Sequence, residues 1–238
     1  MKTIIYLLRG IFLISSSPTF SSGTIILLNG PSASGKSSIQ NEIQKQFDEL
    51  YLKVGIDTFF DSLLPTPDLS LFEEICFFAQ YTKGNELIRS VELKKDGNGN
   101  AIVPLTIGPA GDQIISGMHS AIASYASKNN NLVVDYILYK PEWISDLINS
   151  LKNEKVYLIG IKAPLEVLEE REKKRATSPI GHARSHFETV HHGMIYDLEL
   201  DVSLLSPSES AMQIKSFIKK NPNPQALKQL VQQNSSSK

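Results

Sequence analysis

The pattern of hydrophobic and polar positions alternates between short apolar runs and stretches with helical spacing. Residues 24–28, Thr-Ile-Ile-Leu-Leu, form an uninterrupted apolar run, as expected of a strand buried on both faces. After a glycine-rich turn, Ile39, Ile43, Phe47 and Leu50 recur every three or four residues, which predicts an amphipathic helix. A strand followed directly by a helix is the repeating unit of parallel α/β sheets.

The same alternation continues along most of the chain. Further strands are predicted at 52–57, 132–135, 156–161 and 198–202, and further helices at 114–125, 141–151, 164–175 and 207–219. Pro141 and Pro164 each stand at the start of a predicted helix, where proline is well tolerated. We therefore predict one α/β domain at residues 23–220, with a mainly parallel sheet flanked by helices.

The segment 65–111 interrupts this alternation. Phe72–Phe78 is apolar and fits either a helix or a cover over a cleft. Val91–Leu93 and Ala101–Val103 flank the sequence Asp-Gly-Asn-Gly at 96–99, a strong turn signal. We predict a β-hairpin insertion here.

Both ends of the chain lie outside the predicted domain. Residues 1–22 combine Lys2, two apolar pieces separated by Arg9, and a serine-rich stretch, which are features of a secretory signal. The alternative is an extension without a targeting role. Neither apolar piece approaches the roughly 18 residues of a membrane span, so no stable membrane insertion is expected. Residues 221–238 read as a C-terminal tail with a short helix and a disordered end.

Composition excludes several classes of protein. The chain has 238 residues, with 24 Lys and Arg against 25 Asp and Glu, a formal net charge of −1. Such a balance gives no global support for binding nucleic acid or anionic membranes, so any phosphate site must be a local cluster. Cys76 is the only cysteine, which excludes an internal disulfide and a cysteine-rich zinc site.

Histidines offer a second, weaker metal hypothesis. Four of the five histidines lie close together in the sequence, at positions 182, 186, 191 and 192. No pattern of acids or cysteines accompanies them, so packing or hydrogen bonding is the favoured interpretation.

The most specific motif follows the first strand. Residues 30–37, Gly-Pro-Ser-Ala-Ser-Gly-Lys-Ser, match the phosphate-binding loop (P-loop) pattern G-x-x-x-x-G-K-[ST]. Backbone N–H groups of such a loop surround phosphate, the following helix directs its positive end at the anion, and the lysine reaches the β- and γ-oxygens. The predicted ATP-binding residues are Gly30, Pro31, Ser32, Ala33, Ser34, Gly35, Lys36, Ser37 and Ser38.

Two aspartates at strand ends are candidates for the chemistry. Asp135 ends a predicted strand, where an acid would hold Mg²⁺ together with the Ser37 hydroxyl; the alternative is an acid that caps a loop. Asp57 ends the second predicted strand and suits either a catalytic base or a helix N-cap. Spacing alone leaves both roles of Asp57 open.

An ordered series of segments resembles a known family. They are Ile26–Ser37, Gly55–Thr58, Asp96-Gly97 with Thr106–Pro109, Val133–Asp135, Arg171 with Arg175, and Val190–Gly193 with Tyr196–Asp201. In this order the chain resembles the chloramphenicol 3-O-phosphotransferase family of P-loop kinases. The likeness spans about residues 24–203 and is more specific than the P-loop alone.

The resemblance implies a fold, a reaction and roles for further residues. It implies a three-layer P-loop NTPase fold with a lid, and ATP- and Mg²⁺-dependent phosphotransfer to a small-molecule hydroxyl. Asp57 would be the catalytic base, and Arg171, Arg175 and Arg184 would come from a lid over the phosphates. For Arg171 and Arg175 the alternative is a solvated charged face, because acids and lysines surround them. A homo-oligomer is also implied.

Departures from the family pattern surround the expected acceptor pocket. The chain is longer at Leu64–Gly84, differs across Ala176–His186, and has Tyr136 where the family has a second acid. The acceptor is therefore left open between chloramphenicol and another small alcohol. A toxin-like kinase of a metabolite or nucleotide sugar, and a nucleotide-binding module without turnover, remain alternatives. Dependence on ATP favours a cytoplasmic location, against export directed by residues 1–22.

Overall fold

The structure, a computed structural model, describes residues 22–64, 77–175 and 180–236. The signal-like segment 1–21, most of the apolar stretch around Phe72, the single Cys76 and part of the expected lid lie outside these residues.

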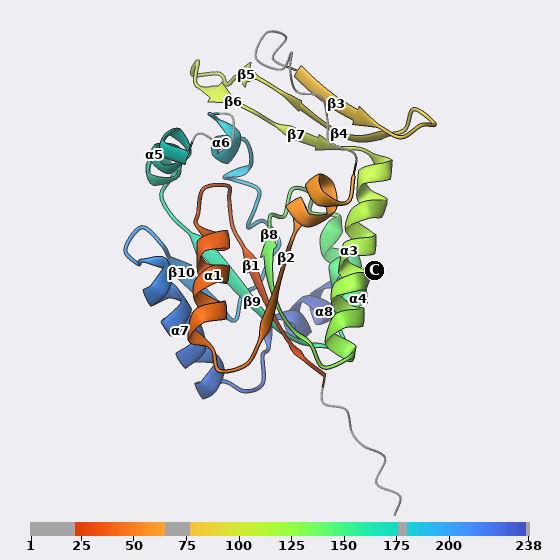
Figure 1. Cartoon of the computed structure of the whole chain (residues 1–238). Helices are drawn as coiled ribbons and strands as arrows, with labels where there is room; N and C mark the ends of the chain where they lie inside the picture. Colours follow the sequence, from red (N-terminus) through yellow and green to blue (C-terminus); the bar gives the residue numbers. More distant parts are fainter. Residues whose placement is uncertain (1–21, 65–76, 176–179, 237–238) are drawn as a thin grey trace, which may run out of the picture.

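A five-stranded parallel sheet forms the centre of the molecule, with strand order β10-β9-β1-β8-β2 (Figure 1). The strands are β1 (Thr24–Asn29), β2 (Tyr51–Gly55), β8 (Asn131–Tyr136), β9 (Lys155–Lys162) and β10 (Leu198–Asp201). Residues Ile25–Leu28 of β1 are fully buried, as expected of the central strand. The predicted parallel α/β architecture is confirmed, although β2 ends at Gly55 and leaves Asp57 two residues beyond it.

Helices cover both faces of this sheet and complete three layers (Figure 1). On one face lie α1 (Lys36–Gln46) and α7 (Pro207–Lys220), and on the other lie α3 (Pro109–Ser127), α4 (Trp143–Leu151) and α8 (Ala226–Ser236). Each layer of helices encloses its own apolar cluster against the sheet, which is how a doubly covered sheet buries both faces.

The C-terminal segment contributes to the core. The expected short helix is α8, and its Ala226, Leu227 and Leu230 belong to the cluster on the α3–α4 face. Asp197 anchors it, because one carboxylate oxygen accepts the N–H groups of Gln225 (2.7 Å) and Ala226 (2.9 Å). The expected C-terminal tail therefore contributes a helix to the folded core.

The insertion is larger than a hairpin. Strands β3 (Phe77–Tyr81), β4 (Leu87–Glu92) and β7 (Leu105–Ile107) form an antiparallel sheet above the carboxyl ends of the central strands (Figure 1). The predicted turn joins β5 (Lys94–Lys95) to β6 (Ala101–Ile102).

The second predicted strand of this hairpin contains β6, but the first predicted strand, Val91–Leu93, was wrong because β6 pairs with Lys94–Lys95. Val91 belongs to β4 and pairs with Phe78 and Leu105, because this apolar residue finds apolar neighbours in the three-stranded sheet. The hairpin itself is short and closed by Asp96, whose carboxylate accepts the N–H groups of Asn98 and Asn100 at 2.9 Å.

Three short elements lie at the carboxyl edge of the central sheet. They are the π-helix η1 (Thr58–Ser62), the last turns of α5 (Leu165–Arg175) and the helix α6 (His182–His186). Among the described residues, no helix is long and apolar enough to cross a membrane. Because parallel strands all end at this edge, loops from distant parts of the sequence meet there.

Candidate active site

The loop at 30–37 connects β1 to α1 and has the backbone of a phosphate-binding turn. Gly35 has φ +89° at the N-cap of α1, a left-handed conformation that favours glycine. At Gly30 a Cβ atom would lie 2.4 Å from the Ile161 carbonyl oxygen of β9, so only glycine fits. Ala33 also has a left-handed backbone, with φ +60°.

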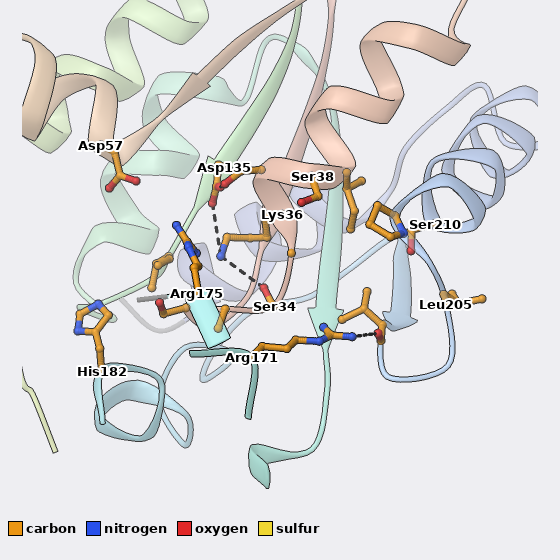
Figure 2. A pocket seen from close by; sticks show the side chains of 18 of the residues that line it. Ser34, Lys36, Ser38, Asp57, Asp135, Arg171, Arg175, His182, Leu205 and Ser210 are labelled. Atoms are coloured by element: carbon orange, nitrogen blue, oxygen red, sulfur yellow. Dashed lines mark hydrogen bonds and ion pairs between the residues drawn. The ribbon is translucent and has the colours of Figure 1, made fainter. Parts of the chain in front are cut away.

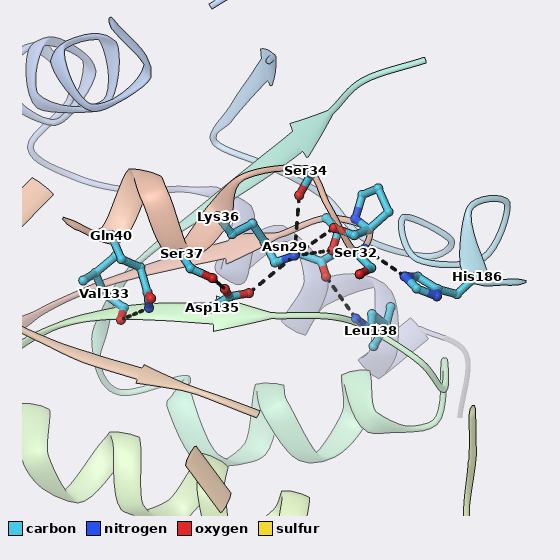
Figure 3. Close-up of polar contacts among 12 residues, drawn as sticks. Asn29, Ser32, Ser34, Lys36, Ser37, Gln40, Val133, Asp135, Leu138 and His186 are labelled. Atoms are coloured by element: carbon cyan, nitrogen blue, oxygen red, sulfur yellow. Dashed lines mark hydrogen bonds and ion pairs between the residues drawn. The ribbon is translucent and has the colours of Figure 1, made fainter. Parts of the chain in front are cut away.

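Lys36 and Ser37 begin α1 and contact the end of β8. The buried Lys36 ammonium donates to the carbonyl oxygens of Gly30 and Pro31, both at 2.9 Å, and lies 3.4 Å from Asp135 Oδ1. The Ser37 hydroxyl donates to Asp135 Oδ2 at 2.7 Å (Figure 3). The structure thus brings together the two oxygen ligands that the sequence predicted for Mg²⁺, and such hard oxygen donors fit that ion.

A cavity of about 540 Å³ opens over this loop (Figure 2). Its lining residues are Ser32, Ala33, Ser34, Gly35, Lys36, Ser37, Ser38, Ile39, Asp57, Asp135, Ile137, Tyr139, Arg171, Arg175, His182, Val202, Leu205, Pro207 and Ser210. Asp57 lies at one end, Leu205 and Ser210 at the other, and Lys36 between them. A single elongated space therefore joins the P-loop to the predicted base.

Asp57 faces this cavity and does not cap a helix. It occupies the N-cap position of η1, yet its side chain makes no capping hydrogen bond. The surrounding walls partly desolvate the carboxylate, and the nearby charges of Asp135 and Asp61 oppose its ionisation, so its pKa is raised. Lys36 and Arg175 partly offset this effect. A carboxyl group with raised pKa in a cleft is a candidate for proton transfer.

The three predicted lid arginines have different positions. Arg171 and Arg175 line the cavity, and Arg171 is held there by donating to the Val202 carbonyl oxygen at 2.7 Å. Arg184 does not line it. Its guanidinium lies 2.6 Å from Glu169 Oε1 and 3.7 Å from Asp96 Oδ2, and these two carboxylates hold it away from the P-loop.

The sequence of the chain from residue 23 to residue 219 matches the family model described as chloramphenicol phosphotransferase-like protein. The chain belongs to the chloramphenicol phosphotransferase-like family. Two curated proteins from Mycobacterium tuberculosis strains CDC 1551 / Oshkosh and ATCC 25618 / H37Rv, each named "Putative O-phosphotransferase", are 25% identical to it over 209 residues. The match covers 87% of this chain and 88% of each relative.

Two of the solved structures with the same fold are kinases. The APS kinase CysC of Mycobacterium tuberculosis, in complex with AMPPNP and APS, superposes with a TM-score of 0.53 and 14% identity, over 84% of this chain and 99% of that one. A shikimate kinase from Acinetobacter baumannii gives a TM-score of 0.52 and 12% identity, over 84% and 94%. These likenesses establish the P-loop kinase fold, and together with the family they support a phosphotransferase.

Several cavity residues of this chloramphenicol phosphotransferase-like protein were missed by sequence reasoning. Ile137 and Tyr139 follow β8, and Val202, Leu205 and Pro207 follow β10. All five come after the carboxyl end of a parallel strand, where α/β proteins place their ligands. That topological rule was the available signal, since none of these residue types carries a motif.

Proposed function

We propose that this protein transfers the γ-phosphoryl group of ATP to a hydroxyl group of a small molecule. The observation that carries the proposal is that Asp57, a carboxylate without a capping role, shares one cavity with the P-loop. A phosphate donor bound by the loop and an acceptor beside the aspartate would therefore meet inside one cavity.

The long shape of the cavity suits a nucleotide that extends away from Asp57. In the proposal, the amides of the loop and Lys36 bind the phosphates. Leu205 and Ser210 then contact the nucleoside, since they line the end of the cavity opposite Asp57. Magnesium would be held by Ser37 and Asp135 and would neutralise charge on the phosphate oxygens.

The residues of this chain divide the reaction between them. Asp57 accepts the proton of the acceptor hydroxyl while the oxygen of that hydroxyl bonds to the γ-phosphorus. The bond between the γ-phosphorus and the β–γ bridging oxygen breaks, which releases ADP. Lys36 and Arg175 stabilise the negative charge on the transferred group. The raised pKa of Asp57 makes the carboxylate a better proton acceptor than an ordinary aspartate.

The decisive experiment compares wild type with Asp57→Asn. Both proteins are incubated with ATP, Mg²⁺ and a panel of small alcohols that includes chloramphenicol, and phosphorylated products are detected by mass. We expect product from wild type, with a rate about 10² to 10⁴ times lower in Asp57→Asn and unchanged ATP affinity. Asp48→Asn is the matched control, because Asp48 is an exposed acid that is paired with Lys215 and does not line the cavity.

Two outcomes would reject the proposal. Full activity in Asp57→Asn would exclude the assigned base. ATP binding without product from any alcohol would favour a nucleotide-binding module that lacks turnover, which was the alternative left open by the sequence.

A further inference from the structure

Helix α6 contacts the P-loop directly through one buried hydrogen bond. The backbone N–H of Ser32 donates to Nε2 of His186 at 3.0 Å, and both residues are buried (Figure 3). The proposed mechanism gives His186 no role. Because Nε2 accepts a hydrogen, the neutral ring must carry its own hydrogen on Nδ1.

The surroundings of His186 keep it neutral and fixed. Its ring packs edge to face against Tyr139, with centroids 5.1 Å apart, and against His182, at 5.0 Å. Burial lowers the pKa of His186 well below the ordinary value, and the neighbouring His182 and Lys36 act in the same direction. His186 is therefore a permanent acceptor for the Ser32 amide near neutral pH.

Helix α6 is itself anchored and can serve as a support. Glu172 of α5 is almost fully buried, and its carboxylate accepts the N–H groups of Gly181 at 2.7 Å and Ala183 at 2.9 Å. From the insertion, the Val103 N–H donates to the Gly181 carbonyl at 3.2 Å and to the Ser185 hydroxyl at 2.6 Å. Helix α6 is thus tied to two other elements besides the P-loop.

The part of the loop that His186 holds needs such support. Ala33, which follows Ser32, has φ +60°. Residues with a Cβ atom adopt this conformation only when their surroundings enforce it. From the other side, Lys36 holds the carbonyl oxygens of Gly30 and Pro31. A bound nucleotide competes for the Lys36 ammonium, which then binds phosphate oxygens. The contact from His186 does not involve that ammonium and can persist in the loaded protein.

We propose that His186 is a positioning residue that holds the first half of the P-loop in its phosphate-binding conformation. This inference rests on one part of the proposed function, the binding of ATP by the P-loop. It also links the nucleotide side of the cavity to its acceptor side, because His182, one turn earlier on α6, lines the same cavity. Its effect should appear in ATP binding more than in acceptor binding.

The test uses His186→Ala, His186→Gln and, as a matched control, His192→Ala at an exposed histidine. ATP affinity is measured by calorimetry, KM is measured for both substrates, and hydrogen exchange of the Ser32 amide is followed without nucleotide. In His186→Ala we expect the Kd and KM for ATP to rise about fivefold to tenfold and the Ser32 amide to exchange faster. The acceptor KM should stay within about twofold. In His186→Gln the side-chain amide oxygen can accept the same hydrogen, so ATP affinity should largely return.

Defined results would overturn the inference. A folded His186→Ala protein with wild-type ATP affinity would do so. An equal rise in KM for ATP and for the acceptor that His186→Gln does not restore would also do so, because it would indicate a general loss of packing around the cavity. If wild type binds ATP but transfers no phosphate, the proposed function fails and the affinity comparison still decides the role of His186. If wild type binds no ATP, both proposals fail.

Discussion

The Ser37 hydroxyl lies 2.7 Å from Asp135 Oδ2, so the first turn of α1 meets the end of β8 at a pair of oxygen ligands. This pairing leads to a prediction on metal dependence. Asp135→Ala should raise the Mg²⁺ concentration needed for half-maximal phosphotransfer by about tenfold or more, because a carboxylate ligand is lost. Magnesium titrations of the initial rate would measure this. Asp48→Ala, at an exposed acid paired with Lys215, should leave the titration unchanged.

Lys36→Ala should weaken ATP binding strongly. The ammonium is buried in the loop and is the only side-chain cation that the P-loop itself contains, so its loss removes a charge-assisted contact to phosphate. We expect the Kd for ATP to rise by about 10- to 100-fold, which a charge-assisted hydrogen bond of roughly 1.5–3 kcal/mol supports. Lys45→Ala, at an exposed lysine of the same helix, is the control. Unchanged ATP affinity in Lys36→Ala would contradict the assignment of the loop.

The pH dependence of activity should report Asp57. The carboxylate must be ionised to accept a proton, so kcat/KM falls as pH drops through its pKa. Because desolvation and the charges of Asp135 and Asp61 raise this pKa above the ordinary 3.8, the acid limb should lie at higher pH than for a solvent-exposed aspartate. A profile of kcat/KM against pH would show it. An acid limb that is unchanged in the residual activity of Asp57→Asn would assign the titration to another group.

The same raised pKa predicts an effect on stability. A carboxylate whose pKa is higher in the folded than in the unfolded protein is unfavourable when ionised, so it lowers stability at neutral pH and this penalty disappears as pH falls below the raised pKa. Asp57→Asn should therefore have a Tm at pH 7 equal to or above that of wild type, while activity is lost. Thermal unfolding without nucleotide would test this, and a clearly lower Tm would refute it.

Removal of α8 should destabilise the whole domain. A chain that ends at Asn221 lacks Ala226, Leu227 and Leu230, which are at most 5% exposed and belong to the core. Burial of side chains of this size contributes about 1.5–3 kcal/mol each for leucine, so we expect a loss of several kcal/mol and poor solubility. Denaturant unfolding would measure the loss. By contrast, a chain without residues 1–22 should keep its activity, and an inactive product would show that the domain needs this segment.

Much of the fold followed from local patterns because buried parallel strands and amphipathic helices have distinct periodicities. The apolar run before the P-loop became β1, and Ile39 and Ile43 became buried residues of α1. The pattern failed at Leu50, which has helical spacing but is 74% exposed beyond the end of that helix. When the helical spacing of apolar residues continues by chance past the end of a helix, the sequence does not show which of these residues pack against the sheet.

The site was predictable where residues belong to a motif or follow a strand of the parallel sheet. The sequence located the P-loop and brought Asp57 and Asp135 to one edge, because strands of a parallel sheet end together. It did not separate Arg175, which lines the cavity, from Arg184, which is paired with Glu169. It also did not find the contact of His186 with Ser32, since the two residues are 154 positions apart. Such contacts depend on how α6 docks, which no local pattern encodes.

The position of α8 also bears on how the protein is made. Asp197 joins α8 to β9, because its second carboxylate oxygen accepts the Leu158 N–H at 2.9 Å. The apolar cluster beside α4 is closed only when α8 docks. During synthesis, the residues of α8 follow all the strands of the central sheet, so that side of the nascent sheet stays open to solvent until α8 has left the ribosome. Chaperone contacts with the unfinished protein are therefore expected on the α4 side, and the interval between synthesis of β10 and docking of α8 is the period of greatest exposure to aggregation.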